Sequence, residues 1–356
     1  MAQDDDPLIS IITVNFNGKR FLYNLFNSIL NLNYPLERLQ IIMVDNNSTD
    51  GSVRFVKKEF PEVEIIALNE NKGYAGGNNE GFYRSRGKYV ALINNDCVVD
   101  KNWLNGMLSV FRQSAGNSKI GAVGSKVVFY YPYLPVQLIT GSSKLDIDGN
   151  KRSRRLGVKI YDIKVGSGKS TFDENIKYME GFYPRESDDS GKAYHWSGGN
   201  AVLAVAVEDL SKDLDLSFKV LSYVSPNNLQ VVIGEEILKD IKVTGRAKTV
   251  RIKVPRRLFN CRKDIINSCG IEVNKSFYSR ERGFGSFDEG QYSGIEEIFG
   301  LSGSSFMMDR KMFEDMSCVD DDFFTYYEDI DLFWRSRLAG WKNFFTPKSI
   351  ARHFHC

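Results

Sequence analysis

Several features common in other protein classes are absent from this sequence. No apolar run reaches the roughly 20 residues that a helix needs to cross a membrane. The five cysteines form no Cys-x-x-Cys pair, and an odd number at wide spacing is typical of reduced thiols in a cytoplasmic protein. Residues 1–7 are acidic and lack the basic start and apolar centre of a signal peptide. We therefore expect a cytoplasmic protein, with peripheral contact at the inner face of a membrane left open.

A strong net charge is also lacking. The formal value of +2 is too small to indicate nucleic-acid binding. The composition, 42% hydrophobic and 26% charged over 356 residues, is that of a globular protein with two domains, or with one domain and a large insertion.

The N-terminal part alternates short apolar runs with amphipathic segments. The apolar runs predict strands at 8–14, 39–44, 61–68 and 90–93, and the amphipathic segments predict helices at 19–31 and 52–59 and a third helix ending near Gly87. This alternation predicts an α/β fold, with a parallel sheet and helices on its faces.

The predicted strands end in polar clusters. Because ligands bind beyond the carboxyl ends of the strands in such sheets, we expect Asn15, Asp45 and Asp96 to converge on one crevice that suits a nucleotide. Asp96 offers the hard oxygen ligand that Mg²⁺ or Mn²⁺ prefers. The alternative is that the segment 94–96 is only a turn after a strand.

The glycine-dense loop 69–81 fits the same interpretation. Glycines let the backbone approach a ligand closely, and Lys72 can offset phosphate charge. The alternative for Gly76 and Gly77 is a tight helix entry without a ligand.

Six segments together resemble glycosyltransferase family 2, an inverting family with the GT-A fold. They are 11–18, 44–52, 71–79, 92–96, 301–308 and 323–332. The third is typical of the rhamnosyltransferase-like branch. The order and spacing of the segments carry the resemblance, rather than any single one.

The resemblance implies that a hexosyl or deoxyhexosyl group moves from a nucleotide-diphosphate sugar to a saccharide or lipid-linked acceptor, in polysaccharide or glycan synthesis. Asp329, with Glu328 beside it, matches the base position. Asp96 matches a metal ligand of the Asp-x-Asp motif, in which Asn94 replaces the first Asp. A later histidine would complete the Mg²⁺ or Mn²⁺ site, and we prefer His353 to His355 because it lies closer to the end of the apolar segment.

The resemblance also implies residues for the two substrates. On the donor side they are Thr13, Val14, Asn15, Asn17, Asp45, Asn69, Lys72, Gly73, Gly77, Asn78, Asn94 and Asn95, and on the acceptor side they are Gly303 and Trp334.

Inverting transfer needs a base for the acceptor hydroxyl and stabilisation of the departing nucleotide diphosphate. Acidic residues also favour the first turn of a helix, so a solvated helix start is the alternative for Glu328 and Asp329. Their aromatic neighbours, Tyr326, Tyr327 and Trp334, favour catalysis.

Three parts are expected along the chain. Residues 1–159 form the nucleotide-sugar part, 160–279 an inserted β-rich, sandwich-like domain, and 280–356 the acceptor and catalytic part. In the insertion, alternating patterns predict strands at 201–207, 214–224, 229–233, 237–243, 249–254 and 271–273.

Two other stretches near or within the insertion have a distinct composition. Residues 153–190, rich in Gly, Ser and charge, predict an exposed linker or mobile loop. Basic residues alternate between Arg246 and Arg257, which predicts a solvated strand face. The alternative is contact with anionic headgroups or a pyrophosphate-linked acceptor.

Two competing functions were weighed. A protein that binds a nucleotide sugar or carbohydrate without turnover would account for Asn94 in place of Asp. A nucleotidyltransferase would need a Gly-rich, basic loop after the first strand, whereas the loop 15–20 is short and rich in asparagine.

Overall fold

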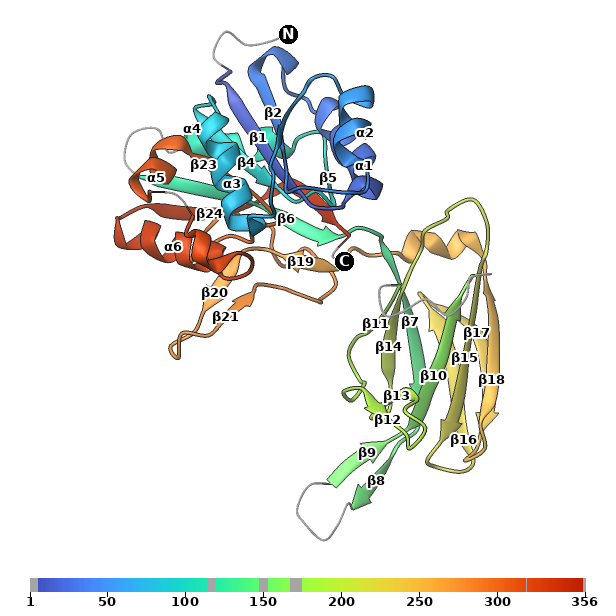
Figure 1. Ribbon diagram of the computed structural model, residues 1–356. Helices are drawn as coiled ribbons and strands as arrows, with labels where there is room; N and C mark the ends of the chain where they lie inside the picture. The colour runs from blue at the N-terminus through green and yellow to red at the C-terminus, as the bar shows by residue number, and fades with distance from the viewer. Residues whose placement is uncertain (1–5, 114–118, 147–152, 167–174, 318, 355–356) are drawn as a thin grey trace. The chain divides into compact units, whose positions relative to one another are not determined.

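The computed structural model describes residues 6–113, 119–146, 153–166, 175–317 and 319–354. They fall into two compact units, one from Met1–Tyr130 with Ile265–Cys356 and the other from Tyr131–Asp264 (Figure 1). The sequence predicted an insertion at 160–279, so both boundaries lie earlier than expected. The reason at the first boundary is that β6 (Ile120–Phe129) and β7 (Tyr133–Thr140) follow each other almost without a break in the apolar pattern.

The first unit is built on a ten-stranded mixed sheet whose N-terminal strands are parallel. β1 (Ile9–Asn15) pairs with β2 (Leu39–Asp45) and β4 (Tyr89–Ile93), and β2 pairs with β3 (Val63–Ala67). Helices α1 (Lys19–Leu30), α2 (Ser52–Glu59) and α3 (Gly73–Arg84) connect these strands. The predicted alternation of strands and helices is therefore confirmed.

The C-terminal segment returns to the same sheet. β23 (Ser305–Asp309) is antiparallel to β4 and β6, and β24 (Lys342–His353) is parallel to β6. Because Ser305 pairs with Ile93, the loop before β23 lies beside the loop after β4, and the Asn94 N–H donates to the Ser304 carbonyl at 3.0 Å. The unit also contains β5 (Cys97–Val99), β19 (Ile266–Ser268), β20 (Ile271–Val273), β21 (Ser279–Glu281), β22 (Glu296–Ile298), α4 (Trp103–Gln113), α5 (Arg310–Asp315) and α6 (Glu328–Leu338).

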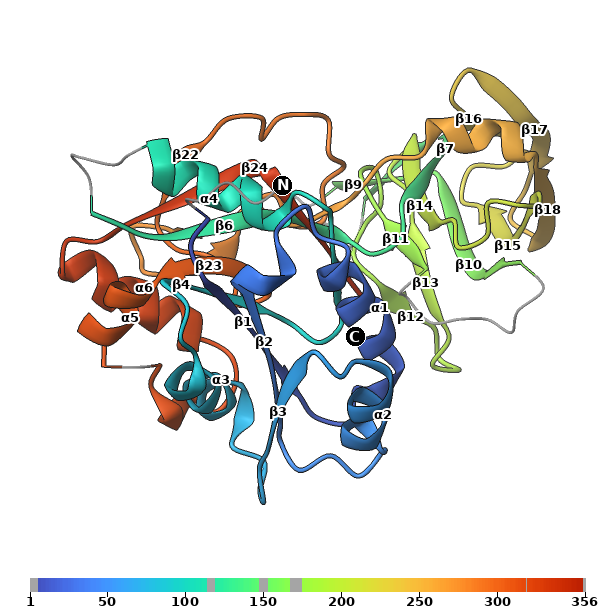
Figure 2. The ribbon, with the colours of Figure 1, turned by 90° about the horizontal axis from the view of Figure 1, so that it is seen from above.

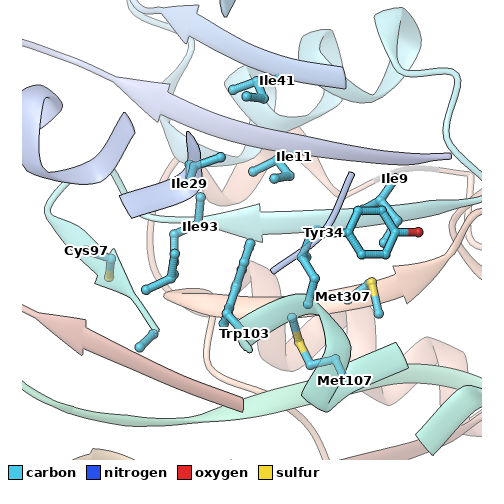
Figure 3. Packing of buried hydrophobic residues seen from close by; sticks show 14 of the residues in the cluster. Ile9, Ile11, Ile29, Tyr34, Ile41, Ile93, Cys97, Trp103, Met107 and Met307 are labelled. Carbon is cyan, nitrogen blue, oxygen red and sulfur yellow. The ribbon is translucent and has the colours of Figure 1, made fainter. Parts of the chain in front are cut away.

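Alternate side chains of the central strands enter two apolar clusters, as in a sheet that is buried on both faces. Ile9 and Ile11 pack with side chains of α1, α2 and α4 (Figure 3), whereas Ile12 packs with side chains of α3, α5 and α6, which gather on one side of the sheet (Figure 2). Trp103 is fully buried in the first cluster, and its indole N–H donates to the Ser305 hydroxyl at 2.9 Å. Each face thus has its own helical layer.

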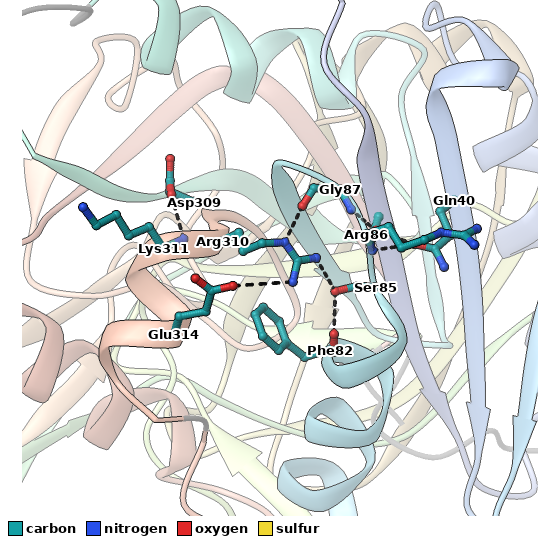
Figure 4. Close-up of polar contacts among 10 residues, drawn as sticks. Gln40, Phe82, Ser85, Arg86, Gly87, Asp309, Arg310, Lys311 and Glu314 are labelled. Atoms are coloured by element: carbon teal, nitrogen blue, oxygen red, sulfur yellow. Dashed lines mark hydrogen bonds and ion pairs between the residues drawn. The ribbon is translucent and has the colours of Figure 1, made fainter.

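Arg310 joins the end of α3 to the start of α5 (Figure 4). Its guanidinium donates to the Gly87 carbonyl and to the Ser85 hydroxyl, each at 2.7 Å, and lies 4.9 Å from the centre of the Phe82 ring. Charge-assisted bonds of this kind fix the two segments together although they are far apart in sequence.

The second unit consists of two five-stranded antiparallel sheets whose inward side chains share one apolar cluster. One sheet comprises β12 (Glu186–Ser187), β13 (Ala193–Trp196), β10 (Val158–Val165), β15 (Leu214–Ser222) and β18 (Lys248–Val254), and the other comprises β11 (Ile176–Tyr178), β14 (Ala201–Ala206), β7, β16 (Asn227–Ile233) and β17 (Glu236–Val243). β14 to β18 coincide with five of the predicted strands. The sixth, β20, belongs to the first unit.

The exposed linker or mobile loop predicted for 153–190 is wrong for the strands in its described part, whereas residues 179–185 and 188–190 lie outside the strands and are exposed or partly exposed. β9 (Ser153–Leu156) pairs there with β8 (Ser143–Asp146), and β10 pairs with β13 and β15. Val158 and Ile160 of β10 are fully buried. The polar composition concealed a strand because its charged side chains alternate with these buried ones.

Two further findings concern surfaces. The basic residues of β18 face solvent and alternate with buried Val250, Ile252 and Val254, as the sequence predicted. None of the helices in the described ranges has the length and apolar character needed to cross a bilayer.

Short 3-10 helices lie at Leu36–Arg38, Arg256–Cys261 and Asp321–Phe323.

Candidate active site

The loops after β1, β2 and β4 meet at Asn15, which is fully buried. Its amide nitrogen donates to Asp45 Oδ1 at 2.9 Å, and its amide oxygen accepts from Asn95 Nδ2 at 2.9 Å. Asp45 Oδ2 also accepts the Ser48 N–H at 2.9 Å. Three polar loops therefore meet at one sheet edge, and Asp45 is held within their network. The third loop contributes Asn95 to the bonds around Asn15, whereas Asp96, which was expected there, pairs with His353.

The start of α3 packs tightly on this edge. A Cβ on Gly77 would lie 2.7 Å from Val14 Cγ1, so only glycine allows the helix to approach the strand this closely. The Asn46 side chain donates to the Gly73 carbonyl at 2.8 Å. The helix-entry interpretation of the glycines thus holds for Gly77, whatever else the loop binds.

Asp96, which follows Asn95, faces His353. Asp96 Oδ1 lies 3.1 Å from His353 Nε2, because β24 pairs with β5 and sets His353 opposite Cys97. The Asn267 side chain contacts the other ring nitrogen of His353 at 3.2 Å and orients the imidazole.

These atoms fit a divalent cation. Adjacent ligands of an octahedral ion with bonds of about 2.0–2.1 Å lie about 3 Å apart, which matches the separation of Asp96 and His353. In the same pocket as His353, Asn94 Oδ1 is buried without a hydrogen-bond partner. Cys97 also lies within the cluster, but burial raises the pKa of its thiol well above the usual range and leaves it a poor ligand. His355 lies outside the described residues.

A pocket of about 220 Å³ connects this end of the site with the acidic start of α6. Asn94 and His353 line it, together with Glu328, Asp329 and Gly303. The two segments proposed for metal binding and for catalysis therefore face one space.

Asp329 is held in a defined position. Its carboxylate accepts the Gly303 N–H at 2.9 Å and the Ile330 N–H at 2.8 Å. Burial raises the pKa of Asp329, whereas these two bonds favour its charged form. A half-buried carboxylate with two fixed donors suits a general base.

Glu328 differs from its neighbour. It is 6% exposed, and its Oε2 has no hydrogen-bond partner. Burial, reinforced by the charge of Asp329, raises the pKa of Glu328 to about 7. At neutral pH the pair therefore holds its first negative charge on Asp329. A merely solvated helix start, the alternative weighed from the sequence, does not fit this burial.

The loop before α6 is unusual in its backbone. Phe324, Tyr326 and Tyr327 all have positive φ, which costs free energy in residues other than glycine. Backbone and side-chain bonds anchor this segment to α3: the Tyr74 N–H donates to the Phe324 carbonyl at 2.7 Å, and Asn79 Nδ2 donates to the Val319 carbonyl at 2.8 Å. The catalytic segment is thus fixed to the glycine-rich one.

Other residues expected at the site have different surroundings. Lys72 forms an ion pair with Glu80 at 2.7 Å, and Asn69 is exposed. Trp334 lies on a later turn of α6, where it packs against Phe299 and Phe277. It does not line the 220 Å³ pocket.

The remaining donor-side residues differ in burial, since Val14 is partly buried and Asn17 is exposed. Thr13 and Asn78 are buried, and the Asn17 side chain accepts the Thr49 N–H at 2.8 Å.

Two residues of the site were missed from the sequence. Asn267 orients His353, and Glu281 lines the pocket and accepts from the Ser268 hydroxyl. Burial raises the pKa of Glu281 to about 7. Asn267 lies in the range assigned to the insertion and Glu281 just after it, and no local pattern marks either residue.

Residues 10–161 match the family model described as Glycosyl transferase family 2. This part of the chain is therefore similar to glycosyl transferase family 2. The mixed sheet of the first unit, with parallel β1 to β4 and antiparallel β23, agrees with the GT-A fold that the resemblance implied.

Curated proteins similar to this chain include Glycosyltransferase AglE of Haloferax volcanii, 26% identical over 129 residues, which are 35% of this chain and 41% of that protein. Another is the putative teichuronic acid biosynthesis glycosyltransferase TuaG of Bacillus subtilis, 31% identical over 106 residues, which are 29% of this chain and 41% of that protein. The chain thus spans about two fifths of the length of these relatives. Among solved structures, the mannosyltransferase PcManGT from Pyrobaculum calidifontis in complex with GDP-Man and Mn²⁺ is 21% identical, with a TM-score of 0.30, over 34% of this chain and 36% of that one.

Proposed function

We propose that the first unit transfers a hexosyl or deoxyhexosyl group, with inversion, from a nucleotide-diphosphate sugar to a hydroxyl of a saccharide or lipid-linked acceptor in glycan synthesis. The observation that carries the proposal is the shared pocket of about 220 Å³, which both Asp329 and His353 line. His353 is the residue that contacts Asp96. The family 2 match and the glycosyltransferase relatives support the reaction class.

In this assignment, Asp329 takes the proton from the acceptor hydroxyl. The hydroxyl oxygen attacks the anomeric carbon from the face opposite the nucleotide diphosphate, which leaves. The N–H groups of Gly303 and Ile330 keep the carboxylate aimed at that space. Glu328 is half protonated at its pKa of about 7 and mainly protonated below it, which leaves the negative charge to Asp329. A divalent cation held by Asp96 and His353 would stabilise the charge of the departing diphosphate.

The donor side depends on the network around Asn15. Its bonds to Asp45 and Asn95 hold three loops at the sheet edge where we expect the nucleotide.

A thermal-shift screen of UDP, GDP and dTDP, each with Mn²⁺ or with EDTA, tests the proposal. We expect one diphosphate to raise the melting temperature by several degrees only when Mn²⁺ is present, since a ligand at 100 times its Kd stabilises by about 2.7 kcal/mol. A protein that binds the nucleotide sugar without turnover would pass this screen but release no nucleoside diphosphate from the matching sugar. No shift with any diphosphate would contradict both.

A further inference from the structure

A second pocket opens beside the proposed active site within the same unit. Its volume is about 620 Å³, against about 220 Å³ for the first. Glu281 and Phe284 line both pockets, so the two spaces adjoin at these side chains. Ligand pockets typically have volumes of roughly 300–1,000 Å³. The first pocket is smaller than this range, and the second falls within it. A ligand larger than one reacting unit would occupy both.

The junction presents an aromatic surface. Phe284 is 53% exposed, and its ring packs against Phe129 with the centroids 5.8 Å apart. Tyr292 also lines the second pocket, and it lies so close to Gly283 that a Cβ there would be 2.7 Å from its ring. Aromatic rings beside polar side chains are typical of sites that bind ligands with apolar faces and polar edges.

Polar groups at the junction are acceptors. Glu281 is placed by β21, and the Ser268 hydroxyl donates to its Oε2. A carboxylate offers about four acceptor positions, so Glu281 can take further hydrogen bonds from hydroxyl groups.

The charges of the second pocket disfavour an anionic ligand. Its lining carries the carboxylates of Glu272 and Glu281 and one cation, Arg280. Arg280 is already paired with Glu272 at 2.8 Å. Among the described lining residues, a diphosphate would therefore meet no cation that is not already paired, whereas a neutral ligand rich in hydroxyl groups needs none.

We propose that the second pocket binds the sugar unit next to the reacting one, so that the acceptor is an extended saccharide, with Phe284 as the stacking surface and Glu281 as a hydrogen-bond acceptor. The proposal rests on the proposed function, because it takes the first pocket as the place of transfer. It selects a saccharide over a lipid diphosphate as the group held beyond that place.

An array of immobilised mono-, di- and trisaccharides of common hexoses, deoxyhexoses and N-acetylhexosamines, probed with the fluorescently labelled full chain, tests the proposal. We expect at least one di- or trisaccharide to bind while its terminal monosaccharide does not. Phe284→Ala should weaken that binding by about tenfold, as truncation of a central aromatic contact does. Phe277→Ala is the matched control, since Phe277 is 75% exposed and lines neither pocket.

Three outcomes overturn the proposal: no saccharide binds, monosaccharides bind as well as longer ones, or Phe284→Ala and Phe277→Ala behave alike. Binding of nucleoside diphosphate with Mn²⁺, measured on the same wild-type preparation, reports the proposed function separately. Saccharide binding without diphosphate binding would leave the second pocket in place and remove the transferase assignment. Diphosphate binding without any preference for longer saccharides would keep the donor site of the proposed function and remove the role of the second pocket.

Discussion

Asp96 Oδ1 lies 3.1 Å from His353 Nε2, although the two residues are far apart in the sequence. The pairing of β5 with β24 brings them together. Asn267 holds the imidazole from its other side at 3.2 Å. Measurements of Mn²⁺ binding therefore test the arrangement of these three residues most directly.

Removing either ligand should weaken Mn²⁺ binding. We expect Asp96→Ala and His353→Ala to lower the affinity measured by calorimetry at least about 10-fold, and Asn267→Ala to lower it less, toward the low end of the 10–100-fold range for supporting residues. Asp100→Ala, an exposed carboxylate at the end of β5, is the control and should leave the affinity unchanged. Unchanged Mn²⁺ affinity in Asp96→Ala would remove the metal site.

Glu328 makes the stability of the fold depend on pH. Its pKa is raised from 4.5 to about 7, so the folded state retains a proton that the unfolded state loses, and the free energy of unfolding falls as pH rises between these values. Glu328→Gln should therefore be more stable than the parent by about 1–3 kcal/mol at pH 8 and equal to it at pH 4. Urea unfolding at both pH values measures this.

The control for that series is Glu62→Gln, which changes an exposed carboxyl. It should follow the parent at both pH values. A Glu328→Gln variant that gains nothing at pH 8 would show that the carboxyl is not buried as described.

Gly77 should tolerate no side chain. Alanine there would bring Cβ to 2.7 Å from Val14 Cγ1, and such overpacking costs about 1–3 kcal/mol. Chemical denaturation should show this loss for Gly77→Ala and none for Gly294→Ala, where nothing lies within 4 Å. Adding Val14→Ala should recover part of the loss, and strict additivity of the two changes would count against the contact.

The sequence predicted the N-terminal half of the site because its signals are local. Buried strands can be recognised in the sequence as apolar runs. The polar residues at their ends, such as Asn15 and Asp45, meet because the ends of parallel strands lie at the same edge of the sheet. Asp329 was found through its motif, and its burial among aromatic residues could be anticipated from Tyr326 and Tyr327.

The remaining parts depend on pairing between distant strands, which leaves no local pattern. Asn267 reaches His353 only because β19 and β24 both pair with β6. Glu281 faces the pocket from a short hairpin whose sequence reads like the strands of the second unit. Lys72 looked available for phosphate, but the fold pairs it with Glu80.

The central claim is that Asp329 accepts the acceptor's proton, and Asp329→Asn tests it most directly. With the diphosphate sugar identified by the thermal-shift screen, Mn²⁺ and a saccharide acceptor, transfer should fall by about 10²–10⁴-fold, while diphosphate affinity by calorimetry stays within about twofold. Asp331→Asn, on the same helix and paired with Arg335 at 2.7 Å, should transfer at nearly the parental rate. Equal transfer by Asp329→Asn and the parent would contradict the account.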